Sequence, residues 1–87
     1  MIEHFYVYIL LSRRDSRLYI GCTNNLKRRL TQHARGEVIS TSKRRPFRLI
    51  HYEYFINETY AKAREVFLKS GAGHKQLKDK LRKTLLF

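Results

Sequence analysis

The sequence predicts an α+β domain in which a three-stranded antiparallel sheet is flanked by helices. Two short runs of aromatic and β-branched residues are separated by a polar turn, a pattern typical of a β-hairpin. Further along the chain, apolar residues recur at helical spacing. The 87 residues contain neither repeats nor a linker, so we expect a single domain over residues 1–87, in the order strand, strand, helix, strand, helix, helix.

The first two strands are expected at residues 5–11 and 18–22, joined by the polar turn at 12–17. Nearly every residue of the first run is apolar or aromatic, which indicates a buried strand. Because strand side chains alternate, one face should carry Phe5, Val7, Ile9 and Leu11, and the other Tyr6, Tyr8 and Leu10.

The first helix should begin near Leu26 with Thr23 or Asn24 as its cap, and end at Gly36. Its apolar stripe is formed by residues spaced four apart, Leu26, Leu30 and Ala34. Residues 37–47 are rich in Ser, Thr and basic side chains and predict a loop, and residues 48–55 predict the third strand.

The second helix is predicted after a capping Asn57 and should end at residues 70–73. Its expected buried stripe consists of Tyr60, Ala63 and Phe67, with Ala61 and Leu68 beside it. A third helix follows, in which three leucines recur at regular spacing, namely Leu77, Leu81 and Leu85.

The charge balance indicates the class of partner. Nineteen Lys and Arg residues against seven Asp and Glu residues give a formal net charge of +12, which favours a polyanion such as nucleic acid. Docking on an acidic protein is the alternative. The single cysteine, Cys22, fits a reducing cytoplasm, and we expect neither export nor membrane insertion.

Tyr8 and Tyr19 lie on the two arms of the hairpin, so their phenols should come close on one sheet face. A purely structural aromatic pair would have the same spacing. Arg29 and His33 flank the stripe of the first helix and should point towards the sheet, where an arginine can reach a phosphate. The alternative for the arginine is a side chain that only covers the helix surface.

Glu65 lies at the edge of the apolar face of the second helix, where a half-buried carboxylate suits a metal ligand. An ion pair with Lys62, Arg64 or Lys69 is the competing interpretation. Glu53 on the third strand is the second inward carboxylate. The four histidines share no metal-ligand spacing, which disfavours transition-metal binding by histidines.

Four features taken together resemble the GIY-YIG endonuclease superfamily: Tyr6-Val7-Tyr8, Tyr19-Ile20-Gly21, Arg29 and then His33. Tyr6 and Val7 replace the Gly and Ile of the family name, but the functional tyrosine is retained as Tyr8. Arg45-Pro46-Phe47 and the stretch from Ala61 to Glu65 are similar to the small stand-alone bacterial members, which are related to the nuclease domain of the excision-repair nuclease subunit. The resemblance covers essentially the whole chain.

The resemblance implies a metal-dependent nuclease that hydrolyses phosphodiester bonds, with DNA favoured over RNA and a role in DNA repair or processing. Its site would use Tyr8, Tyr19, Arg29, His33 and Glu65. Glu65 would hold a single Mg²⁺ or Mn²⁺ ion. The protein would act as a monomer or weak homodimer, with a larger repair partner as a further expectation.

Affinity for the nucleic-acid backbone is expected from basic side chains that track phosphates with little sequence preference, namely Lys27, Arg28, Arg44, Arg45, Arg48 and Lys69. Two other functions compete with a nuclease. One is a non-catalytic nucleic-acid-binding module that keeps the fold and the charge. The other is an adaptor whose basic surface docks on an acidic protein.

Overall fold

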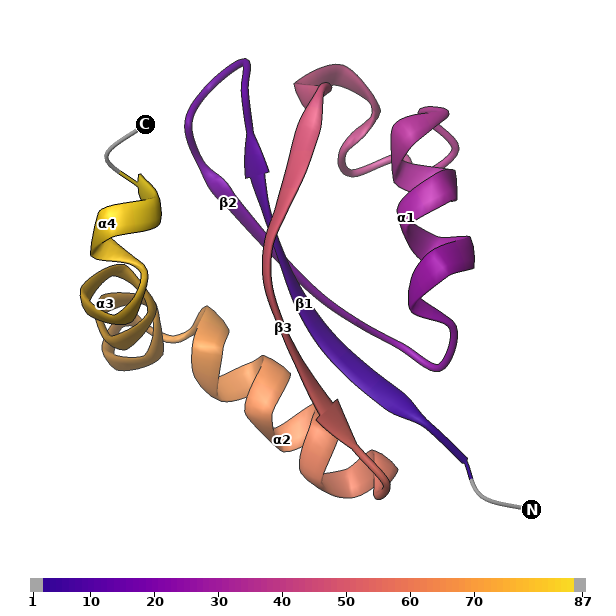
Figure 1. The fold of residues 1–87 in the computed structure, drawn as a ribbon, viewed down its shortest axis with the longest axis vertical. Helices are drawn as coiled ribbons and strands as arrows, with labels where there is room; N and C mark the ends of the chain where they lie inside the picture. The colour runs from indigo at the N-terminus through magenta and orange to yellow at the C-terminus, as the bar shows by residue number, and fades with distance from the viewer. Residues whose placement is uncertain (1–2, 86–87) are drawn as a thin grey trace.

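A computed structural model describes residues 3–85 and confirms the α+β architecture (Figure 1). Its elements are β1 (Phe5–Ser12), β2 (Leu18–Thr23), α1 (Leu26–Ala34), the 3₁₀ turn η1 (Ser42–Arg44), β3 (Phe47–Phe55), α2 (Glu58–Lys69), α3 (Gly71–Lys80) and α4 (Arg82–Leu85). The predicted order is observed, with η1 and the short α4 as additions. Within the described residues, no helix is long and apolar enough to cross a membrane.

The three strands form one antiparallel sheet in the order β2-β1-β3, so the apolar β1 lies in the centre. Tyr8 faces Gly21 on β2 and Tyr52 on β3. Because directly opposite residues point to the same face of a sheet, the register assigns the side chains of both edge strands to faces. An irregularity between Ile9 and Leu10 shifts the pairing with β3.

The main hydrophobic core lies on the face covered by α2 and α3 (Figure 1). Three alternate residues of β1, namely Phe5, Val7 and Ile9, contribute side chains to it. The other buried members are Ile20, Ala61, Leu68, Leu77 and Leu81. The opposite face carries Tyr8 and Leu10 beneath α1, as the alternation predicts.

The predicted stripe of α2 is wrong. Tyr60 is 69% exposed and Phe67 is 39% exposed, whereas Ala61 and Leu68 are completely buried. Two adjacent faces of this helix are apolar enough to be the inner one, and the helix turns its small alanine towards the sheet because the close approach leaves no room for an aromatic ring. The aromatic face is left to solvent.

α1 buries a histidine where apolar residues were expected. His33 is the buried residue of this helix, Leu26 and Leu30 are half-buried, and Ala34 is exposed. The cap is Asn25, whose side chain accepts a hydrogen bond from the Arg28 amide, and not Thr23 or Asn24.

The helix ends are set by a glycine after α1 and by a side-chain cap before α3. Gly36 follows α1 with a φ of 76°, the left-handed conformation that its predicted role as a stop requires. Ser70 caps α3 through the Gly73 amide, so α3 begins at Gly71 inside the expected break. The predicted third helix is divided at Leu81 into α3 and α4.

Candidate nuclease site

Tyr8 lies across β2 because its partner on that strand is a glycine. A Cβ atom added to Gly21 would collide with the Tyr8 phenol, so this close approach needs a residue without a side chain. Tyr8 itself is completely buried. The intact Tyr19-Ile20-Gly21 motif therefore supplies Tyr19 and also leaves room, at Gly21, for Tyr8 of the neighbouring strand.

A chain of polar contacts runs from Tyr8 into the second layer of the molecule. The Tyr8 hydroxyl lies 2.8 Å from Nε2 of His33, and Nδ1 of His33 lies 2.8 Å from the Thr41 hydroxyl. Thr41 donates to the Val38 carbonyl oxygen at 3.3 Å. When the threonine proton is used in this way, Nδ1 of His33 carries a proton and Nε2 accepts one from Tyr8.

Burial keeps both partners of this pair neutral near pH 7. Desolvation, together with the nearby Arg29 charge, lowers the pKa of His33 to about 4. Desolvation also raises the pKa of Tyr8 to about 12, against the opposing hydrogen bond from Arg29. A buried phenol of this kind is a poor base and a good positioning group.

Arg29 and Tyr19 complete the cluster on this face of the sheet. Nε of Arg29 donates to the Tyr8 hydroxyl at 3.4 Å, and Nη1 donates to Oε1 of Gln32 at 3.1 Å. The ring centroid of Tyr19 lies 6.3 Å from that of Tyr8 and 5.0 Å from that of His33. Tyr19 is only half-buried, so it is the phenol that a solvent molecule can reach.

Glu65 reaches this site around the β2 edge of the sheet. α1 and α2 cover opposite faces of the sheet, yet both line a cavity of about 430 Å³ beside β2. Arg29 forms one side of the cavity and Glu65 another. The structure therefore brings all five predicted site residues into one region, with Arg29 as the link between the buried cluster and the cavity.

The donor set of the cavity fits a hard divalent cation. Glu65 and Glu58 supply carboxylate oxygens and Asn24 an amide oxygen, whereas Oε1 of Gln32 already accepts from Arg29. Three cationic side chains, Arg28, Arg29 and Lys62, line the same cavity and would compete with the ion. Within the part of the chain that the structure describes, no three acidic, histidine or cysteine side chains gather into a metal cluster. A cation here would therefore keep most of its water ligands, as Mg²⁺ does.

The competing ion pair of Glu65 is also present. Nζ of Lys69 lies 3.1 Å from its carboxylate, and the Glu65 side chain is 22% exposed while that of Lys69 is 55% exposed. An exposed lysine one helical turn away holds such a contact weakly. A cation or phosphate could therefore displace Lys69 from the Glu65 carboxylate.

Glu53, the second inward carboxylate, is used within the fold. Nε and Nη2 of Arg64 donate to it at 2.8 and 3.2 Å, and Nε2 of His51 lies 3.1 Å away. Burial would raise the pKa of Glu53, but the hydrogen bonds from Arg64 and His51 outweigh it and leave that pKa lowered. It lies on the core face of the sheet, away from Tyr8.

The predicted phosphate contacts divide into two groups. Lys27 and Arg28 are exposed on the first turn of α1, and Arg28 lines the cavity beside Glu65. Arg48 is exposed on β3.

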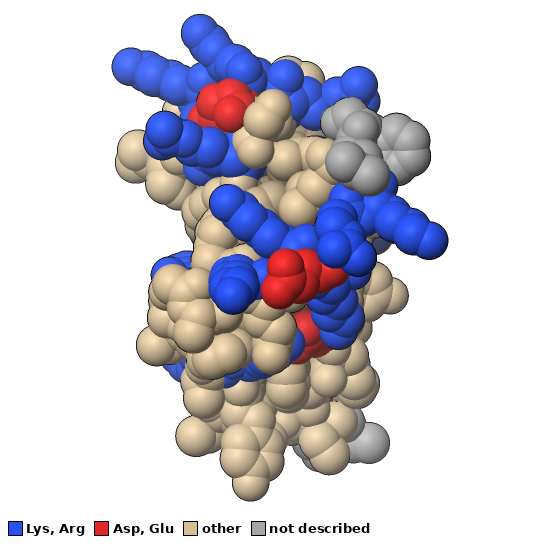
Figure 2. Space-filling view, turned by 90° about the vertical axis from the view of Figure 1, so that its left-hand side faces the viewer, with Lys and Arg blue, Asp and Glu red and all other residues tan. Residues whose placement is uncertain are grey.

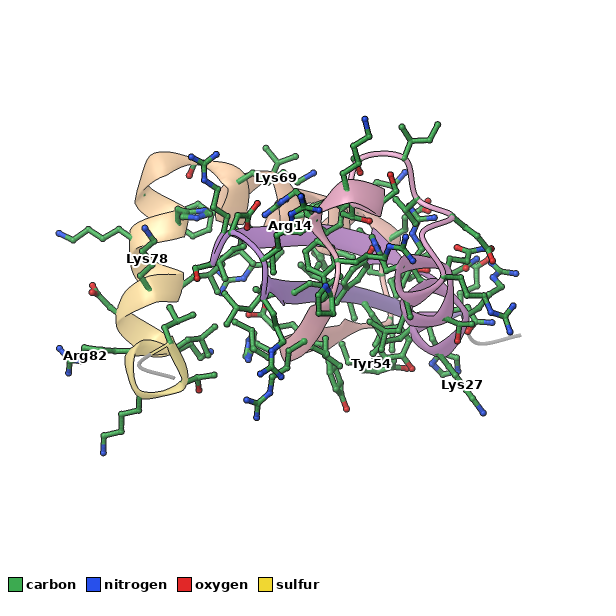
Figure 3. All side chains as sticks on the ribbon, turned by 90° about the horizontal axis from the view of Figure 1, so that it is seen from above. Arg14, Lys27, Tyr54, Lys69, Lys78 and Arg82 are labelled. Atoms are coloured by element: carbon green, nitrogen blue, oxygen red, sulfur yellow. The ribbon has the colours of Figure 1, made fainter. Side chains whose placement is uncertain are left out.

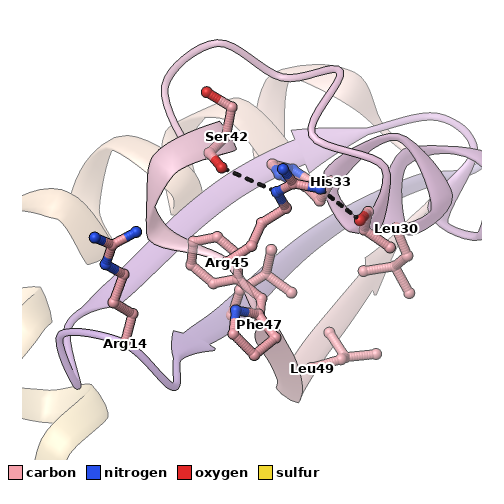
Figure 4. Close-up of a pocket in the computed structure, with 10 residues that line it drawn as sticks. Arg14, Leu30, His33, Ser42, Arg45, Phe47 and Leu49 are labelled. Atoms are coloured by element: carbon pink, nitrogen blue, oxygen red, sulfur yellow. Dashed lines mark hydrogen bonds between the residues drawn. The ribbon is translucent and has the colours of Figure 1, made fainter.

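In the second group, Arg44, Arg45 and Lys69 are hydrogen-bonded within the protein, Lys69 to Glu65. Arg44 forms an ion pair with Asp15 at 2.8 Å. Arg45 donates to the carbonyl oxygens of Ser42 and Ala34, beside a separate apolar pocket of about 560 Å³ between α1 and β3 (Figure 4).

Basic side chains also gather over α3 and α4, a surface that the sequence analysis counted only in the total charge. Figure 2 shows them over the upper part of this side of the molecule, while the lower part is largely uncharged. Lys78 and Arg82 project from this surface (Figure 3). Its exposed members are Lys75, Lys78, Lys80, Arg82 and Lys83.

Two residues near the site were missed from the sequence. Thr41 is completely buried against His33, and Gln32 accepts a hydrogen bond from Arg29. The spacing of Gln32 from Arg29 on one helix was visible in the sequence. Thr41 comes from the folded 37–46 segment, and no local pattern predicts its contact.

Comparison with known proteins places these features in a family. The family model described as "GIY-YIG catalytic domain" matches residues 4–82. A UPF0213 protein of Oceanobacillus iheyensis is 40% identical over 79 residues, which cover 90% of this chain and 91% of the relative. Another, of Clostridium perfringens, is 42% identical over 65 residues, covering 74% of this chain and 69% of the relative.

A solved structure gives the same result for the fold. The solution NMR structure of a UPF0213 protein from Bacillus halodurans is 35% identical and has a TM-score of 0.55. The similarity covers 85% of this chain and 81% of that chain.

Proposed function

The chain belongs to the GIY-YIG family, and from this premise we propose that it is a divalent-metal-dependent endonuclease acting on nucleic acid, with DNA favoured over RNA. One observation carries the proposal. Arg29 touches the buried Tyr8 on one side and lines the cavity that contains Glu65 on the other. A phosphate in that cavity would therefore meet a guanidinium and a carboxylate, and the guanidinium is the one that contacts the tyrosine cluster.

Arg29 is the residue that neutralises the phosphate. Its planar guanidinium can donate two parallel hydrogen bonds to phosphate oxygens, where charge accumulates during attack by water. The contact with Gln32 and the long contact with Tyr8 hold the side chain in the cavity before substrate binds. This preorganisation reduces the entropy lost when the phosphate docks.

Tyr19 orients the attacking water, and Tyr8 positions the groups around it. Tyr19 is accessible, whereas Tyr8 is buried and its oxygen is already shared between His33 and Arg29. His33 is neutral near pH 7 and accepts a hydrogen bond from the Tyr8 hydroxyl, which leaves the phenol oxygen free to accept from Arg29. Replacement of Tyr8 should therefore disturb Arg29 as well as the water.

Glu65 is the proposed ligand of the divalent cation, Mg²⁺ or Mn²⁺. When bound, this ion would stabilise charge on the phosphate and assist the departing oxygen. The carboxylate must leave Lys69 to serve as a ligand, and that exposed pair is weak enough to open. Affinity for the ion without substrate should be low, because both carboxylates of the cavity, Glu65 and Glu58, have lysine neighbours that compete with the ion.

Binding of the polymer would come from exposed basic side chains, with Lys27 and Arg28 nearest to the cavity. Such contacts give an affinity that falls with salt and reads little sequence. We assign the protein to cytoplasmic DNA repair or processing, as a monomer or weak homodimer that can act with a larger repair partner. These assignments follow family resemblance.

The test is cleavage of labelled single-stranded, duplex, flap and branched DNA and matched RNA, with Mg²⁺, Mn²⁺ or EDTA. Wild type is compared with Tyr19→Phe and Glu65→Gln. Each variant has a matched control that makes the same change at an exposed site elsewhere, Tyr60→Phe on α2 and Asp79→Asn on α3.

We expect metal-dependent cutting that falls at least a hundredfold in the two site variants and stays unchanged in the controls, as is typical when a transition-state contact is removed. Glu65→Gln should keep most of its affinity for nucleic acid. Cutting that persists in both site variants would refute the assigned roles. Salt-sensitive binding without any cutting by wild type would favour the non-catalytic binding module.

A further inference from the structure

Three tyrosines form a continuous aromatic surface on the face of the sheet that carries α1. Tyr6 faces Tyr54 across the β1–β3 pair, and Tyr52 is two residues further along β3. The ring centroid of Tyr6 lies 5.4 Å from that of Tyr54 and 6.0 Å from that of Tyr52. We refer to Tyr6, Tyr52 and Tyr54 as the tyrosine platform.

The tyrosine platform is exposed and does not belong to the core. Tyr52 is 51% exposed and Tyr54 is 47% exposed, although both lie on a sheet face that is buried further along, beneath α1. His4 extends the surface, since its ring lies 5.5 Å from that of Tyr54 and hydrogen-bonds to the phenol. Single exposed aromatics are common, but a contiguous group of them indicates a binding surface.

The surroundings of the platform select a class of ligand. A shallow cavity of about 470 Å³ lies between Tyr6, Tyr52 and the start of α1. Among the described residues, those lining it include Lys27 and the amide side chains of Asn24 and Asn25 but no carboxylate. Figure 3 shows Tyr54 and Lys27 on the same side of the molecule. Tyr6 is inclined to Tyr52 by 67° and to Tyr54 by 57°, so each exposed ring offers its own face rather than a share of one plane. Exposed aromatic rings beside a lysine suit a base and its phosphate.

The platform adjoins the candidate nuclease site at one residue. Asn24 lines both the cavity of the platform and the cavity that contains Arg29 and Glu65. A strand whose phosphate lies at Arg29 would therefore pass the beginning of α1 and continue over the tyrosines. Lys27 lines the cavity of the platform, and the next residue of that first turn, Arg28, lines the cavity that contains Glu65.

We propose that the tyrosine platform stacks unpaired bases of the strand that continues out of the nuclease site. This inference rests on the proposed function for the position of the cut, and it names the substrate as nucleic acid with a single-stranded stretch beside the scissile phosphate. In a duplex, neighbouring base pairs cover the faces of each base, so the platform has no free face to stack on.

Binding in EDTA tests the platform separately from cleavage. A labelled oligothymidine strand and a blunt duplex are titrated against wild type, Tyr52→Leu and Tyr54→Leu. Leucine keeps the surface apolar but removes the ring, so each variant should bind the single strand roughly tenfold more weakly. Tyr52→Phe and Tyr54→Phe keep the ring and should bind like wild type. Duplex affinity should not change.

A matched control is available on the other side of the sheet. Tyr60 is 69% exposed and belongs to α2, which covers the opposite face of the sheet from the platform, so Tyr60→Leu should leave single-strand binding unchanged. The chain contains no tryptophan, so Tyr54→Trp provides a unique fluorophore. Its emission should be quenched by the oligothymidine strand, whereas that of Tyr60→Trp should not.

The outcomes separate the two proposals. Leucine variants that bind the single strand as tightly as wild type, or that lose duplex binding equally, would overturn the platform even if the protein cuts. If the leucine variants selectively lose single-strand binding but the wild-type protein never cuts, the platform is supported and the nuclease is refuted. Circular dichroism of each variant confirms that the fold is retained.

Discussion

The buried histidine of α1 makes the stability of this protein depend on pH in a defined direction. His33 is 1% exposed, and its pKa falls from 6.5 to about 4 on folding because burial and the Arg29 charge disfavour the protonated ring. Above pH 6.5 both the folded and unfolded states hold the neutral ring. As the pH falls towards 4, the unfolded state gains a proton that the folded state refuses, so stability decreases.

The size of this effect follows from the two pKa values. The interval from 6.5 to about 4 corresponds to roughly 3 kcal/mol, at about 1.4 kcal/mol for each pH unit. A small domain has a total stability of about 5 to 15 kcal/mol, so the loss is a large share of it. Below about pH 4 the folded state is protonated as well, and this group causes no further change.

Urea unfolding of wild type and His33→Gln, followed by far-UV circular dichroism at a series of pH values, measures the effect. Glutamine cannot take up the proton, so the free energy of unfolding of the variant should fall less between pH 6.5 and 4. Contributions of the carboxylates and the other histidines cancel in the difference. An NMR titration of the His33 ring gives its pKa directly.

Two results would refute the reasoning. One is a parallel loss of stability in both proteins over this pH range. The other is an NMR titration in which His33 takes up its proton near the ordinary value of 6.5 in the folded state. Either result would mean that the ring is solvated or that the charge of Arg29 is screened from it.

Three further substitutions test single contacts. Gly21→Ala should lower the free energy of unfolding by about 1 to 3 kcal/mol and reduce any cleavage, because the added methyl group displaces the Tyr8 phenol. A variant that unfolds at the same temperature as wild type would contradict this. Glu53→Gln should cost about 1 to 3 kcal/mol in urea unfolding at pH 7 by weakening the pair with Arg64, and a change below about 0.5 kcal/mol would show that water replaces the contact. Thr41→Val leaves a buried imidazole nitrogen without its partner, at about 1 to 3 kcal/mol in the same assay; unchanged stability together with an unchanged NMR titration of the histidine would exclude the hydrogen bond.

The strands could be predicted from the sequence because the alternation of side chains along a strand is a local property. Phe5, Val7 and Ile9 lie in the core, and Tyr8 points to the other face, as the period of two requires. The break at Gly36 and the cap at Asn57 were also local, since each depends on one residue and its own backbone.

The faces that the helices turn towards the sheet were harder to predict from the sequence. Periodicity shows that a helix has an apolar side, but α2 offers two, and contact with the sheet selected the one with Ala61. On α1 the hydrogen bonds of His33 with Tyr8 and Thr41 made a polar residue the buried one. Helix propensity and periodicity do not include hydrogen bonds to residues that are distant in the sequence.

The sheet, the order of elements and the positive charge could be predicted from the amino-acid sequence, because these depend on residue type and local spacing. The site residues stay a prediction that the family resemblance supplied. Which groups contact one another follows from the packing of the elements. This packing buried Tyr8 and left Tyr19 half-buried, paired Glu53 with Arg64, and brought Glu65 around the sheet edge towards Arg29. Such contacts depend on how helices rotate and dock against the sheet, and that choice minimises the free energy of the whole chain and not of any segment.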